Sequence, residues 1–88
     1  MYLHIGQETV VDTKDIIGIF DLDTSTVNKS TRDYLNLAEK KGEVITITDD
    51  LPKSFVVVKN KKEKIVYISQ LSSSTLQKRN SLGIKVYK

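Results

Sequence analysis

The chain has 88 residues, of which 39% are hydrophobic and none is cysteine, and its formal net charge is +3. A chain this short forms one domain, residues 1–88, and association with copies of itself would add to its modest stability. The lack of cysteine excludes disulfides and cysteine-based metal sites, and no apolar run reaches the ~20 residues of a membrane helix. We therefore expect a soluble cytoplasmic protein without a membrane partner.

The charges are distributed unevenly along the chain. Residues 1–44 carry 5 Lys or Arg and 8 Asp or Glu, a balance of −3, whereas residues 45–88 carry 9 and 3, a balance of +6. Such a split indicates two faces, one of which attracts anions. A lysine-rich surface that only keeps the protein in solution has the same composition, so this alternative stays open.

Two strands are predicted in the first quarter of the chain. Residues 2–5 are a short strand candidate that ends at Gly6, and the apolar segment 9–11 follows. Residues 16–20, "IIGIF", are β-branched and aromatic and are bounded by acidic turn residues, which is typical of a buried strand. Gly18 inside this run indicates a bulge or a close backbone approach.

The best-marked helix is predicted over residues 31–41. Ser30 and Asp33 have the spacing of a capping box, in which the hydroxyl accepts from the amide three residues on and the acid reaches back. Two lysines at the end of the segment suit the negative end of the helix dipole, and Gly42 is a natural C-terminal stop.

After Gly42 the apolar residues alternate with period two, as they do in strands. Strands are predicted at 44–48, 54–58 and 65–68, and the last two form a hairpin around a polar turn. Pro52 has no backbone donor and separates the first strand from the second. We expect the three strands to form an antiparallel meander. The fold class is then α+β: a mostly antiparallel sheet, one well-marked helix and one short C-terminal helix.

The segment "SSSTLQKR", residues 72–79, places four hydroxyl residues before a basic pair. Hydroxyls of this kind either cap a helix or hold a phosphate. Ser74 and Gln77 repeat the capping-box spacing, so we expect a capping role and a short helix over residues 75–80. Residues 84–87 are expected to form a weak strand or a docked arm.

Candidate catalytic and metal-binding residues are few. His4 stands alone in an apolar strand, whereas a general base or a metal ligand needs partners at a defined geometry. The acids Asp21 and Asp23, and the acids Asp49 and Asp50, follow strands and would bind a divalent ion, act as general acid and base, or form turns. Turns are favoured, because no nucleophile or phosphate-loop motif accompanies these acids. We expect no enzyme activity, no cofactor and no metal.

Basic residues are concentrated in the second half of the chain. Lysines crowd the predicted hairpin turn, another precedes a strand, and a basic pair follows the serines; these residues are Lys59, Lys61, Lys62 and Lys64, then Lys53, then Lys78 and Arg79. Phosphate recognition uses such cations together with hydroxyls and helix amides. The alternative is that the lysines protect a hairpin edge from aggregation.

Four segments carry a family resemblance: "YLHIG", "VVDTKDIIGIFD", "PKSFVVV" and "VYISQLSSSTLQKR". Over residues 2 to about 80 the chain resembles the RemA/RemB family of small bacterial extracellular-matrix regulators, and its RemB-type members most closely. The resemblance implies a DNA-binding transcriptional regulator of matrix and biofilm genes. It also implies a ring-shaped homo-oligomer and a fold related to LytTR-type DNA-binding domains. DNA would run along a basic surface and be held mainly through its phosphates.

The chain departs from the RemA pattern at the family's basic positions. Where RemA-type members carry an arginine before the buried strand, this chain has Asp15 beside Lys14, and their arginine-rich turn is replaced by "DDLPK", which leaves Lys53. We predict Lys14, Lys53, Lys78 and Arg79 as phosphate contacts. A second hypothesis is an oligomeric scaffold that partners a RemA-like regulator without touching DNA, because aspartates repel phosphate.

Overall fold

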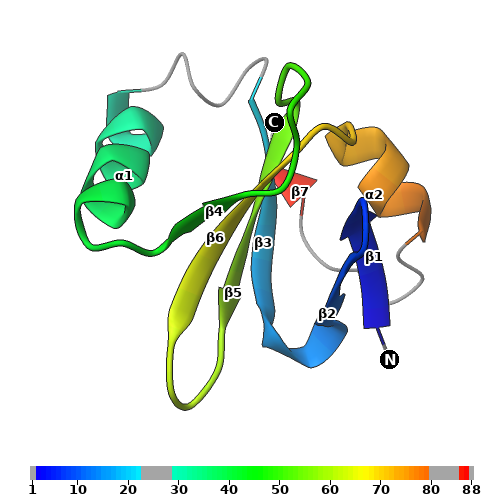
Figure 1. Cartoon of the computed structure of the whole chain (residues 1–88), viewed down its shortest axis with the longest axis horizontal. Coiled ribbons are helices and arrows are strands. Elements are labelled where there is room, and N and C mark those ends of the chain that lie inside the picture. The colour runs from blue at the N-terminus through cyan, green and yellow to red at the C-terminus, as the bar shows by residue number, and fades with distance from the viewer. Residues whose placement is uncertain (1, 23–28, 80–85, 88) are drawn as a thin grey trace.

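A five-stranded sheet occupies the middle of the molecule, between a helix on one face and a two-stranded hairpin with a short helix on the other (Figure 1). This computed structural model describes residues 2–22, 29–79 and 86–87. Along the chain, the elements are β1 (Tyr2–Gly6), β2 (Thr9–Asp12), the 3-10 helix η1 (Thr13–Asp15), β3 (Ile16–Asp21), α1 (Lys29–Lys40), β4 (Val44–Thr46), β5 (Ser54–Lys59), β6 (Lys64–Ser69), α2 (Ser73–Arg79) and β7 (Val86–Tyr87). The predicted α+β class is confirmed.

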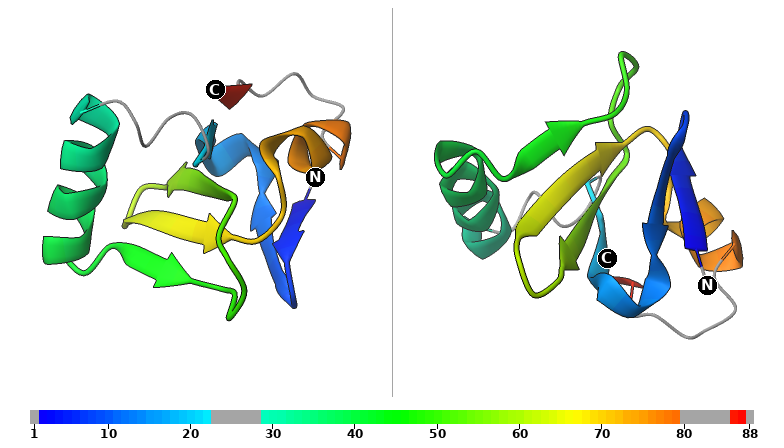
Figure 2. Two further views of the ribbon diagram at one scale, coloured as in Figure 1. Left: turned by 90° about the horizontal axis from the view of Figure 1, so that it is seen from above. Right: turned by 60° about the horizontal axis from the view of Figure 1, so that its bottom comes forward.

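The strand order in the main sheet differs from the predicted one. The order is β4-β6-β5-β3-β7, and β5 runs antiparallel to both of its neighbours. The antiparallel meander predicted for residues 44–48 is wrong, because β4 pairs in parallel with β6. After β4 the chain passes the end of β6 and enters β5 on the far side of that strand (Figure 2).

Burial explains why β5 takes the central place. All residues from 54 to 58 are buried. Phe55 and Val57 pack in the core on the α1 side, whereas Val56 and Val58 pack in the core that the β1–β2 hairpin and α2 cover. A strand that is apolar on both faces needs cover on both faces. β4 lies at the edge of the sheet, where Ile45 is 44% exposed.

The end of α1 is built as the sequence predicts. Gly42 has a φ of 72°, which favours glycine. Its amide donates to the Glu39 carbonyl at 3.0 Å, and the Glu43 amide donates to the Ala38 carbonyl at 2.9 Å. These two bonds form a Schellman motif, which satisfies carbonyls that the helix leaves without an internal donor.

Two other local predictions have different outcomes. The register of β3 against β5 shifts between Ile16 and Gly18, which agrees with the bulge, one of the two alternatives predicted for Gly18. The helix α1 begins at Lys29, so Ser30 lies in its first turn and not at the cap where the capping-box spacing placed it.

The cap of α2 is Ser72 and not Ser74. The Ser72 hydroxyl accepts from the Thr75 amide at 3.1 Å, and the Ser72 carbonyl accepts from the Leu76 amide at 3.1 Å. The helix therefore begins at Ser73, earlier than predicted. The capping role predicted for the serines is confirmed, although a different serine supplies it.

The predicted C-terminal strand is present over residues 86–87. These residues form β7, which pairs in parallel with β3 at the edge of the main sheet. Residues 84 and 85 of the predicted strand, and residue 80 of the predicted helix, lie outside the described part of the chain.

Three buried serines join the layers at the corner between β6 and α2. The Ser69 hydroxyl donates to the Ile5 carbonyl in β1 and accepts from the Leu71 amide. Ser54 in β5 donates to the Leu71 carbonyl at 2.7 Å, and Ser73 donates at 3.0 Å to the carboxylate that ends β3. Each of the three serines is at most 1% exposed. Their hydroxyls therefore fasten the hairpin and α2 to the main sheet.

We predict that Ser69→Ala lowers the free energy of unfolding by about 1–3 kcal/mol, because it leaves a buried carbonyl and a part-buried amide without a partner. Urea denaturation followed by circular dichroism measures the change. The control is Ser74→Ala on the exposed face of α2, where a loss under about 0.5 kcal/mol is expected. Equal losses in the two variants would contradict a structural role for the Ser69 hydroxyl.

Candidate nucleic-acid interface

The turn between β5 and β6 holds its lysines in a fixed backbone frame. The Asn60 side-chain oxygen accepts from the amides of Lys62 and Glu63 at 2.8 and 3.0 Å, and the Asn60 amide donates to the Glu63 carbonyl at 3.0 Å. These bonds satisfy the turn internally. Lys61 and Lys62 are exposed, so their ammonium groups face solvent.

The short helix η1 brings Lys14 to the same turn. Ile16 pairs with Val58 near the end of β5, which places η1 beside the turn that follows. Asp12 caps η1 by accepting from the Lys14 amide at 3.2 Å, and its other oxygen lies 3.7 Å from the Lys14 Nζ. The Lys14 side chain is 78% exposed, so this ion pair contributes little and leaves the cation accessible to another anion.

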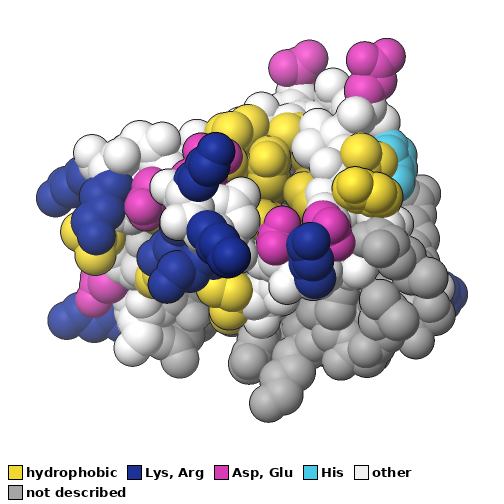
Figure 3. All heavy atoms as spheres, turned by 90° about the horizontal axis from the view of Figure 1, so that it is seen from below, with side chains coloured by type: hydrophobic (Ala, Val, Ile, Leu, Met, Phe, Trp, Pro, Cys, Tyr) yellow, Lys and Arg dark blue, Asp and Glu magenta, His cyan; other side chains and the backbone are white. Residues whose placement is uncertain are grey.

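A shallow hollow of about 350 Å³ marks where these segments meet. It is lined by Lys14, Asp15, Asn60, Lys61 and Lys62. We call the three lysines around it the basic tip. Figure 3 shows the molecule from below, where basic side chains gather over this end of the sheet and over α1. The lining offers a phosphate three cations and one amide side chain, against the Asp15 carboxylate in the lining and the Asp12 carboxylate beside Lys14.

Lys53, a predicted phosphate contact, lies at the other end of β5. Its amide donates to the Ser69 carbonyl at 2.9 Å, and its carbonyl accepts from the Leu22 amide at 3.0 Å. Six residues of extended chain separate it from Lys59, or roughly 20 Å at ~3.3 Å per residue. The structure therefore does not bring Lys53 together with Lys14.

The surroundings of Lys53 are acidic. Asp49 and Asp50 are exposed in the loop that leads to it, and Asp21 ends the neighbouring strand β3. The Asp50 amide donates to the Thr48 hydroxyl at 2.9 Å, so this pair of acids forms a turn, as predicted. The main sheet thus carries its cations at the β5–β6 turn and an excess of carboxylates at the opposite end.

The basic pair lies at the C-terminal end of α2, whose first residue, Ser73, bonds Asp21 at the end of β3. Lys78 is exposed on the last turn of the helix. Arg79 ends the helix, and its side chain lies outside the described part of the structure. The hydroxyls before this pair already have partners within the chain: Ser73 bonds Asp21, and Ser72 bonds Ser74 and Thr75. Capping and layer contacts therefore account for the serines.

The residues considered for catalysis or metal binding do not form a site in the described part of the chain. The exposed His4 imidazole is hydrogen-bonded through Nε2 to the Gln7 carbonyl at the tip of the β1–β2 hairpin. Asp23 lies outside the described residues. Among residues 2–22, 29–79 and 86–87, no group of three or more His, Cys, Asp or Glu side chains is arranged to hold a metal ion. No helix in the same part of the chain is long and apolar enough to cross a bilayer.

Comparison with known proteins identifies the family. Residues 2–79 match the family model named RemA-like, which is described as extracellular matrix regulatory protein A-like. The chain belongs to this family. It is also 41% identical over 80 residues to extracellular matrix regulatory protein B of Bacillus subtilis (strain 168), and the match covers 90% of this chain and 89% of that protein. The family predicted from the sequence is confirmed. The relative's name describes a regulatory protein and not an enzyme.

Lys61 and Lys62 are the part of the candidate site that sequence reasoning did not select. The density of lysines in the predicted turn was a visible signal, but a hairpin turn that only repels aggregation has the same composition. What distinguishes these two lysines is their position beside Lys14, which depends on the pairing of β3 with β5.

We predict that Asp15→Asn strengthens binding to an immobilised polyanion such as heparin. Removing a carboxylate from beside three lysines is expected to raise affinity by up to about fivefold, which is the size of one exposed charge interaction. The salt concentration that elutes the protein from a heparin column measures the effect. Asp50→Asn makes the same change in net charge at the acidic end of the sheet and is expected to shift elution less. Equal shifts would contradict a localised anion site.

Proposed function

We propose that this protein is a DNA-binding regulator of extracellular-matrix genes that acts in the bacterial cytoplasm as a homo-oligomeric ring. Membership of the RemA-like family and the name of the Bacillus subtilis relative support the regulatory role. The geometry of the basic tip supports the DNA contact. In this proposal the tip faces the phosphates of the duplex and contributes most of the affinity through charge.

The observation that carries the proposal is the convergence of Lys14, Lys61 and Lys62 on one hollow from segments far apart in the sequence. Three lysines on one subunit bind DNA weakly at physiological salt. A ring repeats the tip at regular intervals, and contacts that are linked in this way bind much more tightly than a single one. The proposal therefore needs both the tip and the assembly.

The four predicted phosphate contacts differ in how far the position of each residue supports this proposal. Lys14 is supported by its position in the basic tip, and Lys61 and Lys62 join it. Lys53, Lys78 and Arg79 remain predictions. The acidic surroundings of Lys53 argue for a smaller contribution from that residue.

A second candidate function is an oligomeric scaffold that binds a RemA-like partner and not DNA. Two observations favour it: Asp15 lines the hollow of the basic tip, and Asp49 and Asp50 are exposed near Lys53. Carboxylates at these places lower the affinity for phosphate and suit a basic protein surface instead.

We predict that the double variant Lys61→Gln/Lys62→Gln binds a long DNA duplex about tenfold or more weakly than the unchanged protein. The slope of log affinity against log salt is expected to fall by about 0.9 for each phosphate that the variant no longer neutralises. Fluorescence anisotropy with labelled duplex between about 50 and 200 mM salt measures both quantities.

The matched control is Lys40→Gln/Lys41→Gln at the exposed C-terminal end of α1. It removes the same net charge, so any long-range attraction falls equally in the two variants. Equally weakened binding in both variants would show that the attraction is diffuse and would remove the basic tip from the proposal. A flat titration of the unchanged protein at low salt, with assembly intact, would favour the scaffold function.

A further inference from the structure

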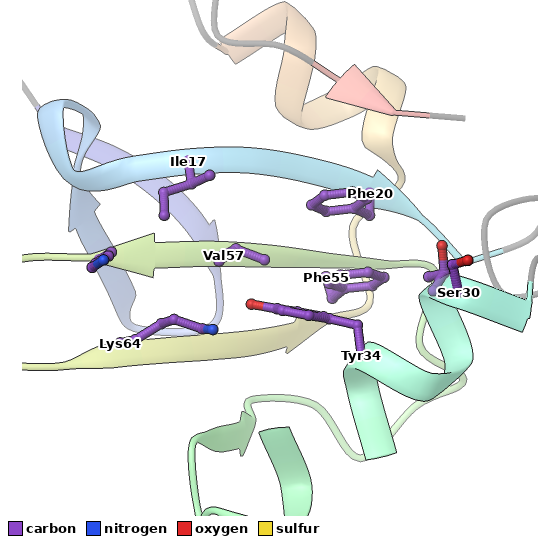
Figure 4. Close-up of a pocket in the computed structure, with 9 residues that line it drawn as sticks. Ile17, Phe20, Ser30, Tyr34, Phe55, Val57 and Lys64 are labelled. Carbon is purple, nitrogen blue, oxygen red and sulfur yellow. The ribbon is translucent and has the colours of Figure 1, made fainter. Parts of the chain in front are cut away.

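A second surface of the molecule is apolar and open to solvent. Between α1 and the main sheet lies a groove of about 460 Å³, whose apolar lining comes from Ile17, Phe20, Tyr34, Phe55 and Val57. The rings of Phe20 and Phe55 are stacked, with centroids 4.6 Å apart and planes at 4°, and Tyr34 reaches toward them from α1 (Figure 4). Ile17 is 53% exposed at its margin. We call this surface the apolar groove.

Cations border the apolar groove on one side. Lys59 and Lys64 form the last pair of the β5–β6 ladder, and both line the groove. The Lys64 Nζ lies 4.8 Å from the centroid of the Tyr34 ring, a cation–π contact that holds this ammonium over the apolar surface. An occupant of the groove therefore has to be apolar, with negative charge beside it.

The outer face of the β1–β2 hairpin has these properties. Side chains alternate across a strand, so Leu3, Ile5 and Val11 enter the core, while the opposite face presents Tyr2, His4 and Val10 to solvent. Tyr2 is 71% and Val10 56% exposed. We call this outer face the hairpin strip. One end carries a negative charge, since the exposed Glu8 lies in the hairpin turn, whereas at the other end the Asp12 carboxylate lies beside Lys14.

The apolar groove and the hairpin strip lie on opposite sides of the main sheet. Phe55 and Val57 of β5 point into the groove side, and Val56 and Val58 point to the core that the hairpin covers. Figure 1 shows α1 and the hairpin at opposite sides of the molecule. The strip therefore cannot reach the groove of its own chain, whereas the strip of a second copy can.

We propose that the hairpin strip of one copy docks in the apolar groove of the next, with Glu8 near Lys59 and Lys64 across the interface. This inference rests on the homo-oligomer of the proposed function and names the surfaces that would build it. Two different surfaces on opposite sides of one chain give a head-to-tail contact, which closes into a ring when the rotation per subunit allows it. Docking also covers apolar side chains that a chain of this size otherwise leaves in water.

Two single variants and their mixture test the interface. Ile17→Arg places a cation in the apolar groove, beside Lys59 and Lys64. Val10→Arg places a cation on the hairpin strip, which would face the same two lysines of the neighbouring copy. Both positions are more than half exposed, so each variant is expected to keep its fold, which circular dichroism checks. We predict that each variant alone is monomeric, at 10.0 kDa, in light scattering, whereas the unchanged protein has several times that mass.

The mixture is the decisive measurement. A chain with an altered groove keeps an intact strip, and a chain with an altered strip keeps an intact groove. Equimolar mixing is therefore expected to give a 1:1 dimer of about twice 10.0 kDa that grows no further. Persistent monomers in the mixture, or assembly of either variant alone to the mass of the unchanged protein, would overturn the inference. So would an unchanged protein that stays monomeric at all concentrations.

The control is Leu51→Arg, which alters an apolar side chain that is 79% exposed and lies on neither surface. It is expected to leave the mass unchanged. A DNA titration separates this inference from the proposed function. If the two interface variants still assemble while the unchanged protein binds DNA, the interface is wrong and the function stands. If they are monomeric and pair on mixing, but the unchanged assembly does not bind DNA, the interface stands and the DNA contact is wrong.

Discussion

The corner between β6 and α2 is the constraint on which the rest of the structure depends. Here the hydroxyls of Ser54, Ser69 and Ser73, all buried, bond to groups in the corner itself, in β1 and at the end of β3. A buried hydroxyl without a partner is costly, so these bonds fix the corner in one arrangement. That arrangement holds the hairpin and α2 over one face of β5. On the other face of β5, α1 covers only part of the sheet, and the apolar groove lies between them.

The same framework decides where the charges lie. Because β3 and β5 run antiparallel, the start of β3 meets the end of β5, and Lys14 arrives beside the β5–β6 turn. Lys53 enters β5 at the opposite end, among Asp21, Asp49 and Asp50. The positive balance in the second half of the sequence is therefore not spread over one face. Four of the nine basic residues of that half, Lys59, Lys61, Lys62 and Lys64, lie at the β5–β6 turn, where Lys14 from the acidic half joins them.

Features that depend on neighbouring residues could be predicted from the sequence, and features that depend on the path of the chain could not. Gly42 ends α1 with a positive φ, and the register of β3 against β5 shifts beside Gly18, so both features coincide with a signal that is local in the sequence. The partner of β4 was mispredicted, because the crossing after β4 is decided by which strand needs cover on both faces. The proximity of Lys14 to Lys61 and Lys62 also depends on the path of the chain, through the pairing of β3 with β5. The sequence therefore predicted Lys14 as a phosphate contact but not these two lysines. The apolar groove has no sequence signature, since Ile17 and Phe20 look like ordinary residues of a buried strand.

The chemistry of the basic tip limits the kind of DNA recognition that the proposed function can have. Its cations are lysines, which are point charges, whereas arginine would offer a planar fork to phosphates or base edges. Contacts of lysine with phosphate position a protein on a duplex but carry no sequence information directly. Any preference among DNA sequences then has to come from the spacing of successive tips around the assembly, which favours duplexes that bend to follow it. In the proposed function, the interface between subunits therefore decides selectivity as well as affinity.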